Sequence, residues 1–217
     1  RSISWLRNFA FTIDYFNIRI DDLITVIPFQ FILNQCYQAQ DETLCDNVQR
    51  LAQNEGPNNA GFIFNINTET INFGFLETEG LDLTASWRQN LENWGLAGTL
   101  NARLAYTHLI KFEVLQVGSV LDPIDREIGA SRNKAFGTLS YQLGDWGLTL
   151  RGTYIGPAYL DDQFLALIGL PPNDPLAKVG SEFVTDMQMR FTPGDNYEFY
   201  FGVDNLFDNA PPPVLRG

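Results

Sequence analysis

The chain alternates apolar and polar residues with a period of two over several long stretches. Successive side chains of a β-strand point to opposite faces, so this alternation predicts strands with one apolar face and one polar face. One stretch shows both series clearly: Leu81, Leu83, Ala85 and Trp87 against Asp82, Thr84, Ser86 and Arg88. The pattern predicts seven long strands, at about 8–20, 70–91, 96–112, 133–144, 147–158, 181–192 and 196–207.

The polar positions of these strands carry charged and hydrogen-bonding side chains. A charge that faces lipid near the bilayer midplane costs about 2–4 kcal/mol, so we expect these residues to face a wet lumen or a polar plug. A small barrel fills its interior with side chains, and this much polarity therefore favours a wide barrel. Pairing Phe191 with Tyr197 across their turn also predicts an ion pair between Arg190 and Glu198. The predicted lumen-facing residues are Asp82, Thr84, Ser86, Arg88, Thr99, Asn101, Arg103, Thr149, Arg151, Asp186, Gln188, Arg190 and Glu198.

The connections between the predicted strands alternate between short and long. Tight turns are expected at the sequences "ENWG", "GDWG" and "TPGDN", whereas the other links span roughly 21–69, 113–132 and 159–180. Short turns at one end and long loops at the other are typical of outer-membrane barrels, and such long loops are uncommon in compact soluble domains. Large aromatic residues near the short turns indicate an interfacial girdle: Trp87, Trp94, Tyr141 and Trp146. The predicted fold is therefore all-β, an antiparallel transmembrane β-barrel.

Composition and charge narrow the classes of function. The 217 residues contain no apolar run of the ~18 residues that a transmembrane helix requires. A net charge of −12 argues against a nucleic-acid partner, because a phosphate binder needs a basic face. Most of the negative charge lies in the long links, and residues 21–69 hold seven acidic residues against Arg50 alone. Such a surface is either a solvated rim or a field that attracts cationic ligands.

The candidate chemistry is limited to one pair of cysteines. Cys36 and Cys45 lie nine positions apart in a polar segment, which predicts a disulfide, with two unrelated thiols as the alternative. His108 is the single histidine, so a catalytic triad would have to be built around it, and its place on an apolar face indicates an interfacial role. No phosphate-binding glycine loop, HExxH or GxSxG motif is present. We therefore expect no enzyme activity and no cofactor.

Three stretches resemble the C-terminal barrel of TonB-dependent outer-membrane receptors: "IDYFNIRIDDLI" near the start, "LETEGLDLTASWRQNL" in the middle and "GVDNLFDNAPPP" near the end. The resemblance implies a barrel of 22 strands, of which residues 1–217 would form the C-terminal portion, without the N-terminal plug domain and the final closing strand. It also implies three partners: outer-membrane lipid, the TonB complex through the missing N-terminal region, and an extracellular small-molecule or metal-chelate ligand.

The function implied by this resemblance is active uptake across the outer membrane of a Gram-negative bacterium. Family members take up scarce nutrients such as ferric siderophores, cobalamin, haem or oligosaccharides. A passive porin-type channel shares the same strand pattern and is the first alternative. A soluble β-sandwich binding module also alternates apolar and polar residues and is the second.

Overall fold

The computed structural model of the protein describes residues 8–52 and 61–214. The chain divides into two compact units, which are described separately. The first unit comprises residues 1–17, 78–112 and 124–217, and the second comprises residues 18–77 and 113–123. Within the described ranges, no helix has both the length and the apolar character needed to cross a membrane.

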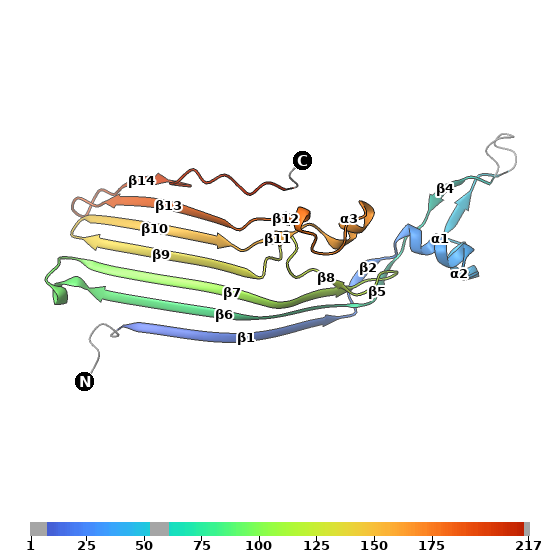
Figure 1. Cartoon of the computed structure of the whole chain (residues 1–217), viewed down its shortest axis with the longest axis horizontal. Coiled ribbons are helices and arrows are strands. Elements are labelled where there is room, and N and C mark those ends of the chain that lie inside the picture. Colours follow the sequence, from blue (N-terminus) through green and yellow to red (C-terminus); the bar gives the residue numbers. More distant parts are fainter. Residues whose placement is uncertain (1–7, 53–60, 215–217) are drawn as a thin grey trace. The chain divides into compact units, whose positions relative to one another are not determined.

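Seven long strands form one open antiparallel sheet, in the order β1-β6-β7-β9-β10-β13-β14 (Figure 1). The alternation predicted these strands, although residues 70–72 belong to a separate short strand and β14 is shorter than the predicted 196–207. The all-β fold class is confirmed. The other sheets of the described residues have two strands each, too few for the second layer of a sandwich, so the sandwich alternative is wrong. A short strand, β8 (Asp122–Pro123), pairs with the end of β7. The long strands have these bounds: β1 Phe9–Asp21, β6 Phe75–Asn90, β7 Thr99–Leu115, β9 Asn133–Leu143, β10 Trp146–Ile155, β13 Glu182–Phe191 and β14 Phe199–Val203.

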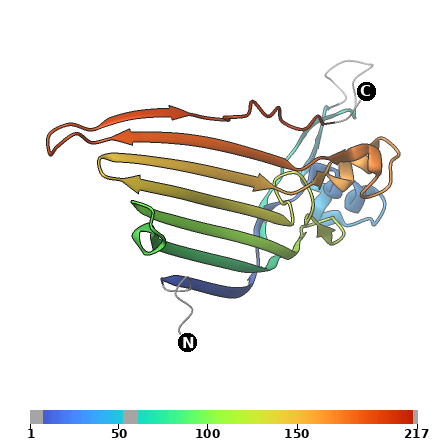
Figure 2. The ribbon, with the colours of Figure 1, turned by 60° about the vertical axis from the view of Figure 1, so that its left-hand side comes forward.

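Three short turns join neighbouring strands at one end of the sheet (Figure 2). The first contains a 3₁₀ helix, η2 (Leu91–Trp94), which ends at Gly95 with φ of 77°. The second has only two residues between β9 and β10, and Gly144 occupies its first position with φ of 54°, a conformation that glycine adopts without strain. Trp94 lies in its turn as predicted, whereas Trp146 is the first residue of β10 and lies outside the turn.

The register of the last hairpin differs from the predicted one by two residues. Phe191 pairs with Phe199 instead of Tyr197, and Arg190 therefore lies opposite Tyr200. A shift of two residues leaves every side chain on its original face, because the side-chain period of a strand is also two. The Arg190 guanidinium still reaches the Glu198 carboxylate, with 3.3 Å between Nη1 and Oε1.

The rim of the first unit is folded where the sequence suggested long loops. Residues 159–180 contain α3 (Asp162–Leu167) and η3 (Pro175–Ala177), and β11 (Ala158–Tyr159) pairs with β12 (Lys178–Val179). Leu165 is fully buried there. The segment between β8 and β9 joins this rim, because the Tyr159 amide donates a hydrogen bond of 2.8 Å to the Arg126 carbonyl.

The second unit is also folded, although its residues 21–69 were expected to form an open loop. Its core consists of Ile27, Ile32 and Val117, against which partly buried apolar side chains pack. These apolar side chains explain why the segment folds, since their burial removes apolar area from water. The helices and short strands of the unit are α1 Phe29–Tyr37, α2 Glu42–Cys45, β2 Ile24–Val26 paired with β5 Thr70–Asn72, and β3 Val48–Arg50 paired with β4 Ile63–Ile66.

Candidate functional site

The cross-strand register gathers the predicted polar side chains on one face of the sheet, here called the polar face. Residues directly opposite each other in neighbouring strands share a face, so each row of partners can be followed across the sheet. The rows are Asn101–Ser140–Thr149–Gln188, Arg103–Thr138–Arg151–Asp186 and Thr99–Gln142–Gly147–Arg190.

Strand β6 contributes the remaining residues of the polar face. The Thr107 hydroxyl donates a hydrogen bond of 2.6 Å to the Asp82 carboxylate, which places Asp82 on the same face as Thr107, Arg103 and Asn101. Further residues follow Asp82 at every second position of β6, and a strand repeats its faces with that period. These residues are Thr84, Ser86 and Arg88.

Hydrogen bonds connect polar side chains across several strands. The hydroxyl oxygens of Ser140 and Thr149 lie 3.0 Å apart. Arg190 donates through Nη2 to the Gln142 side-chain oxygen at 3.1 Å, in addition to its contact with Glu198. These contacts tie β9, β10, β13 and the last turn together, which is a structural role for the polar face.

A hollow of about 300 Å³ lies on the polar face beside Arg88 and Arg103. The other side chains that line it are neutral, and most are hydroxyl or amide groups: Asn8, Ser86, Trp87, Asn101, Ala102, Thr138 and Ser140. Among the described residues, neither arginine forms an ion pair. A site with two guanidinium groups and no carboxylate in its lining favours anions, although the whole chain is strongly acidic.

The opposite face, here called the apolar face, carries aromatic side chains at the turn end of the sheet. Trp146 stacks on Phe191, with ring centroids 4.2 Å apart, and Phe191 stacks in turn on Phe199 at 6.5 Å. The rings of Trp87 and Trp94 lie 6.0 Å apart beside the first turn. Tyr141, the fourth predicted girdle residue, donates a hydrogen bond of 2.8 Å from its hydroxyl to the Ala97 carbonyl.

The apolar face also has a second aromatic row, which the sequence analysis missed. Tyr106 lies opposite Ala135, Ala135 opposite Tyr154, and Tyr154 opposite Phe183. Trp146 and Tyr154 are eight residues apart in β10, which corresponds to about 26 Å along the strand and about 20 Å at a tilt near 40°. That height is close to the ~25 Å apolar band of outer-membrane barrels.

The region between the two rows is apolar and only partly covered by protein. Leu104 is 48% exposed, Leu139 is 43% exposed and Phe201 is 60% exposed. A continuous apolar band of this size is unusual on a protein surface that faces water. Tyr154 lies eight residues after Trp146, and Phe183 lies eight residues before Phe191. This even spacing was the sequence signal for the second row, since it keeps residues on one face.

His108 lies beside this second row, on the apolar face. Its Nδ1 is 2.8 Å from the side-chain oxygen of Asn133, which also accepts a hydrogen bond of 2.6 Å from the Tyr106 hydroxyl. The three side chains satisfy one another at the end of the apolar band. No group of three or more metal-ligating side chains is found in the described ranges, either here or elsewhere.

The cysteine pair belongs to the second unit. Cys36 in α1 and Cys45 in α2 are joined by a disulfide bond, with their Cα atoms 4.8 Å apart. The Asp41 carboxylate caps α2 and accepts hydrogen bonds from the amide and the hydroxyl of Thr43, at 3.1 and 2.6 Å. The hydroxyl is the main reason why the pKa of Asp41 is lowered from its usual value of 3.8, since hydrogen bonds to the carboxylate favour its charged form.

These features define the class of protein. A single antiparallel sheet with short turns at one end, one polar face, and one apolar face bounded by aromatic rows is the wall of a transmembrane β-barrel. The sequence matches the family model "TonB dependent receptor-like, beta-barrel" over residues 2–206, and the chain belongs to this family. It is a family of receptors and transporters of the Gram-negative outer membrane.

A comparison with solved structures supports the same fold. The FrpB iron transporter from Neisseria meningitidis (F3-3 variant) superposes with a TM-score of 0.56 at 17% sequence identity. The match covers 97% of this chain and 25% of the FrpB chain, so the sequence spans about a quarter of that transporter's length. No curated protein matches the sequence.

Proposed function

We propose that the chain forms part of the barrel wall of a TonB-dependent receptor that actively takes up a scarce nutrient. In this proposal residues 1–217 form the C-terminal portion of a longer barrel of about 22 strands. The open edges at β1 and β14 and the quarter-length match to FrpB support this. The observation that carries the functional proposal is the two-faced sheet of a chain that belongs to the receptor family.

The two faces have different partners in this proposal. The apolar face, with its aromatic rows, contacts outer-membrane lipid. The polar face lines the lumen, where charges such as Arg103 and Asp186 avoid the cost of facing lipid. The TonB complex, engaged through an N-terminal region beyond this chain, supplies the energy for uptake.

The proposed cargo is an iron chelate such as a ferric siderophore. Support comes from the similarity in fold to FrpB, which is an iron transporter. Cobalamin, haem and oligosaccharides remain alternative cargoes for members of this family. The long acidic links, at about 21–69, 113–132 and 159–180, would lie outside the cell and contribute to ligand capture.

The test uses the full-length gene in a Gram-negative host that lacks its own iron receptors. We expect radiolabelled iron to enter cells from at least one ferric chelate, and we expect uptake to stop when TonB is deleted. Equal uptake with and without TonB would contradict active transport and would favour the porin-type channel. TonB-dependent uptake of labelled cobalamin, haem or an oligosaccharide, with no iron chelate transported, would keep the receptor and change its cargo.

A further inference from the structure

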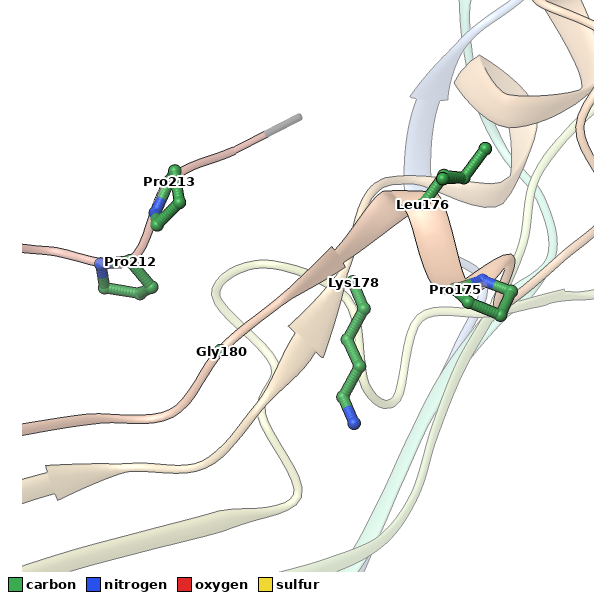
Figure 3. A pocket seen from close by; sticks show the side chains of 6 residues that line it. All are labelled: Pro175, Leu176, Lys178, Gly180, Pro212 and Pro213. Atoms are coloured by element: carbon green, nitrogen blue, oxygen red, sulfur yellow. The ribbon is translucent and has the colours of Figure 1, made fainter. Parts of the chain in front are cut away.

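A hollow of about 440 Å³ opens in the first unit between the folded rim and the proline-rich segment near residue 213 (Figure 3). Its volume lies within the range of ordinary small-molecule sites, roughly 300–1,000 Å³. Pro212 and Pro213 face the other lining residues across the open space (Figure 3). Six described residues line it: Pro175, Leu176, Lys178, Gly180, Pro212 and Pro213.

The rim side of the hollow is held in place by the backbone of η3. Asp174 caps this turn and accepts a hydrogen bond of 2.8 Å from the Leu176 amide, and Pro175 has a fixed φ at the first helical position. Ala177 is buried below, and Lys178 continues into the β11–β12 pair. The Leu176 side chain nevertheless stays 71% exposed, because its anchored backbone holds it at the surface.

The proline side is held by a series of asparagine contacts. The Asn209 side chain donates a hydrogen bond of 2.8 Å to the Phe183 carbonyl of β13, and its amide donates one of 3.0 Å to the Asn205 side chain. The Asn205 amide in turn donates to the Asp186 carboxylate at 2.9 Å. These bonds attach the segment to β13 and place the Pro212 ring beside Gly180. The rim wall and the start of the proline-rich segment are therefore both held by hydrogen bonds.

The lining has one charge and no acidic residue. Lys178 is the single cation of residues 159–180, and no ion pair of the described chain engages it. The other lining groups are three proline rings, a leucine side chain and a glycine. Proline rings are rigid apolar surfaces that pack well against flat aromatic rings, as in the docking of proline-rich peptides on aromatic grooves.

We propose that this hollow is a binding subsite for a small aromatic carboxylate, whose ring packs against Pro212 and Pro213 beside Gly180 and whose negative charge meets Lys178. The inference deepens the proposed function, since it assigns an aromatic acid group to the cargo, and it rests on that function for its biological meaning. Binding itself can be measured without transport. Failure of the subsite and failure of the uptake function are therefore distinguishable.

Gly180 provides a matched pair of variants. A Cβ atom built at Gly180 meets only Pro212, at 3.6 Å, which is an ordinary van der Waals contact. Gly180→Ala is therefore expected to leave the hollow open, whereas Gly180→Leu fills it with a branched side chain. Lys178→Gln removes the charge at nearly constant size, and Lys178→Arg retains it.

The measurement is fluorine-19 NMR line broadening of 4-fluorobenzoate, with neutral 4-fluorobenzamide as the reference probe, on the purified full-length receptor. We expect the benzoate to bind more tightly than the benzamide, and we expect Lys178→Gln to weaken its binding about tenfold, as for the loss of one charge-assisted hydrogen bond. Gly180→Leu should abolish binding of both probes, whereas Gly180→Ala and Lys178→Arg should retain binding of the benzoate.

Three results would overturn the proposal: no saturable benzoate binding, equal affinity for the benzamide, or benzoate binding that survives Gly180→Leu. Each variant is also tested for the heat-resistant gel mobility of a folded barrel, so that a misfolded sample is not scored. Benzoate binding by a receptor without TonB-dependent uptake would retain the subsite and refute the transport function. TonB-dependent uptake without benzoate binding would retain the transport function and refute the subsite.

Discussion

The assignment of the apolar face to lipid predicts a depth-dependent cost of charge along β10. Leu150 lies midway between Trp146 and Tyr154, four residues or about 13 Å of strand from each aromatic row. Arginine at this position would sit near the midplane of the bilayer. The neighbouring Arg151, on the polar face, already shows that β10 accepts a guanidinium when it points to the other side.

The expected magnitude follows from this position. Leu150→Arg should lower the free energy of unfolding by about 2–4 kcal/mol more than Leu150→Ala does, because the alanine variant accounts for the lost leucine. Phe183→Arg, in the second aromatic row, should exceed Phe183→Ala by only about 0–1 kcal/mol. Thr149→Arg should differ little from Thr149→Ala, since both variants lose the contact with Ser140 and the arginine would lie on the polar face.

The assay is denaturant unfolding of the full-length receptor in lipid vesicles, with the folded fraction read from gel mobility without heating. Each arginine variant is compared with the alanine variant at the same site. An arginine penalty as large at Thr149 as at Leu150 would refute the assignment of faces. A penalty at Phe183 equal to that at Leu150 would refute the proposed depth of the band.

Three further predictions concern local geometry. Alkylation of exported protein without reductant should label neither Cys36 nor Cys45, because the two are joined by a disulfide bond. Replacing both by serine should lower the local free energy of unfolding of their loop, measured by hydrogen exchange, by about 2–3 kcal/mol. Gly98→Ala should destabilise the folded receptor more than Gly95→Ala. Both glycines have positive φ, but only a Cβ at Gly98 would clash, at 2.5 Å from the Gln142 carbonyl oxygen. Equal losses in the free energy of unfolding, measured by chemical denaturation, would contradict this. Because the pKa of Asp41 is lowered in the folded protein, its stabilising effect on α2 is present above about pH 4 and is lost as the pH falls through that lower pKa. Amide hydrogen exchange of Thr43 should therefore become faster at the lower pH. Asp41→Ala should remove this pH dependence.

The strands were predictable because their signal is local. Alternation fixes which side chains share a face, and the positions of all seven long strands follow from it. The register of the last hairpin was not predictable in the same way, because pairing Phe191 with Tyr197 or with Phe199 gives the same two faces. The stacking of Phe191 on both Trp146 and Phe199 favours the observed register, and that contact depends on a third strand.

The fold of the second unit could not be predicted from local pattern, because its core joins distant parts of the chain. Val117 packs with Ile27 and Ile32, although about 85–90 positions separate it from them in the sequence. Residues 21–69 have no long periodic stretch, and their acidic residues suggested an open loop. Neither feature shows that a segment after β7 completes the core.

The second aromatic row was missed for a related reason. Tyr106, Tyr154 and Phe183 stand in three different strands, and each alone is an unremarkable aromatic residue, with Tyr106 in the middle of β7 and the other two near strand ends. They form one row only after the registers of β7, β9, β10 and β13 are known. Of those pairings, only β9–β10 is joined by a short turn, whereas β7 and β9, and β10 and β13, are joined by long links. The second row therefore depends on pairings between segments that are far apart in the sequence. A change in the length of one turn by a single residue would move the aromatic residues of the following strand to the polar face, and the barrel wall would lose both boundaries of its apolar band there.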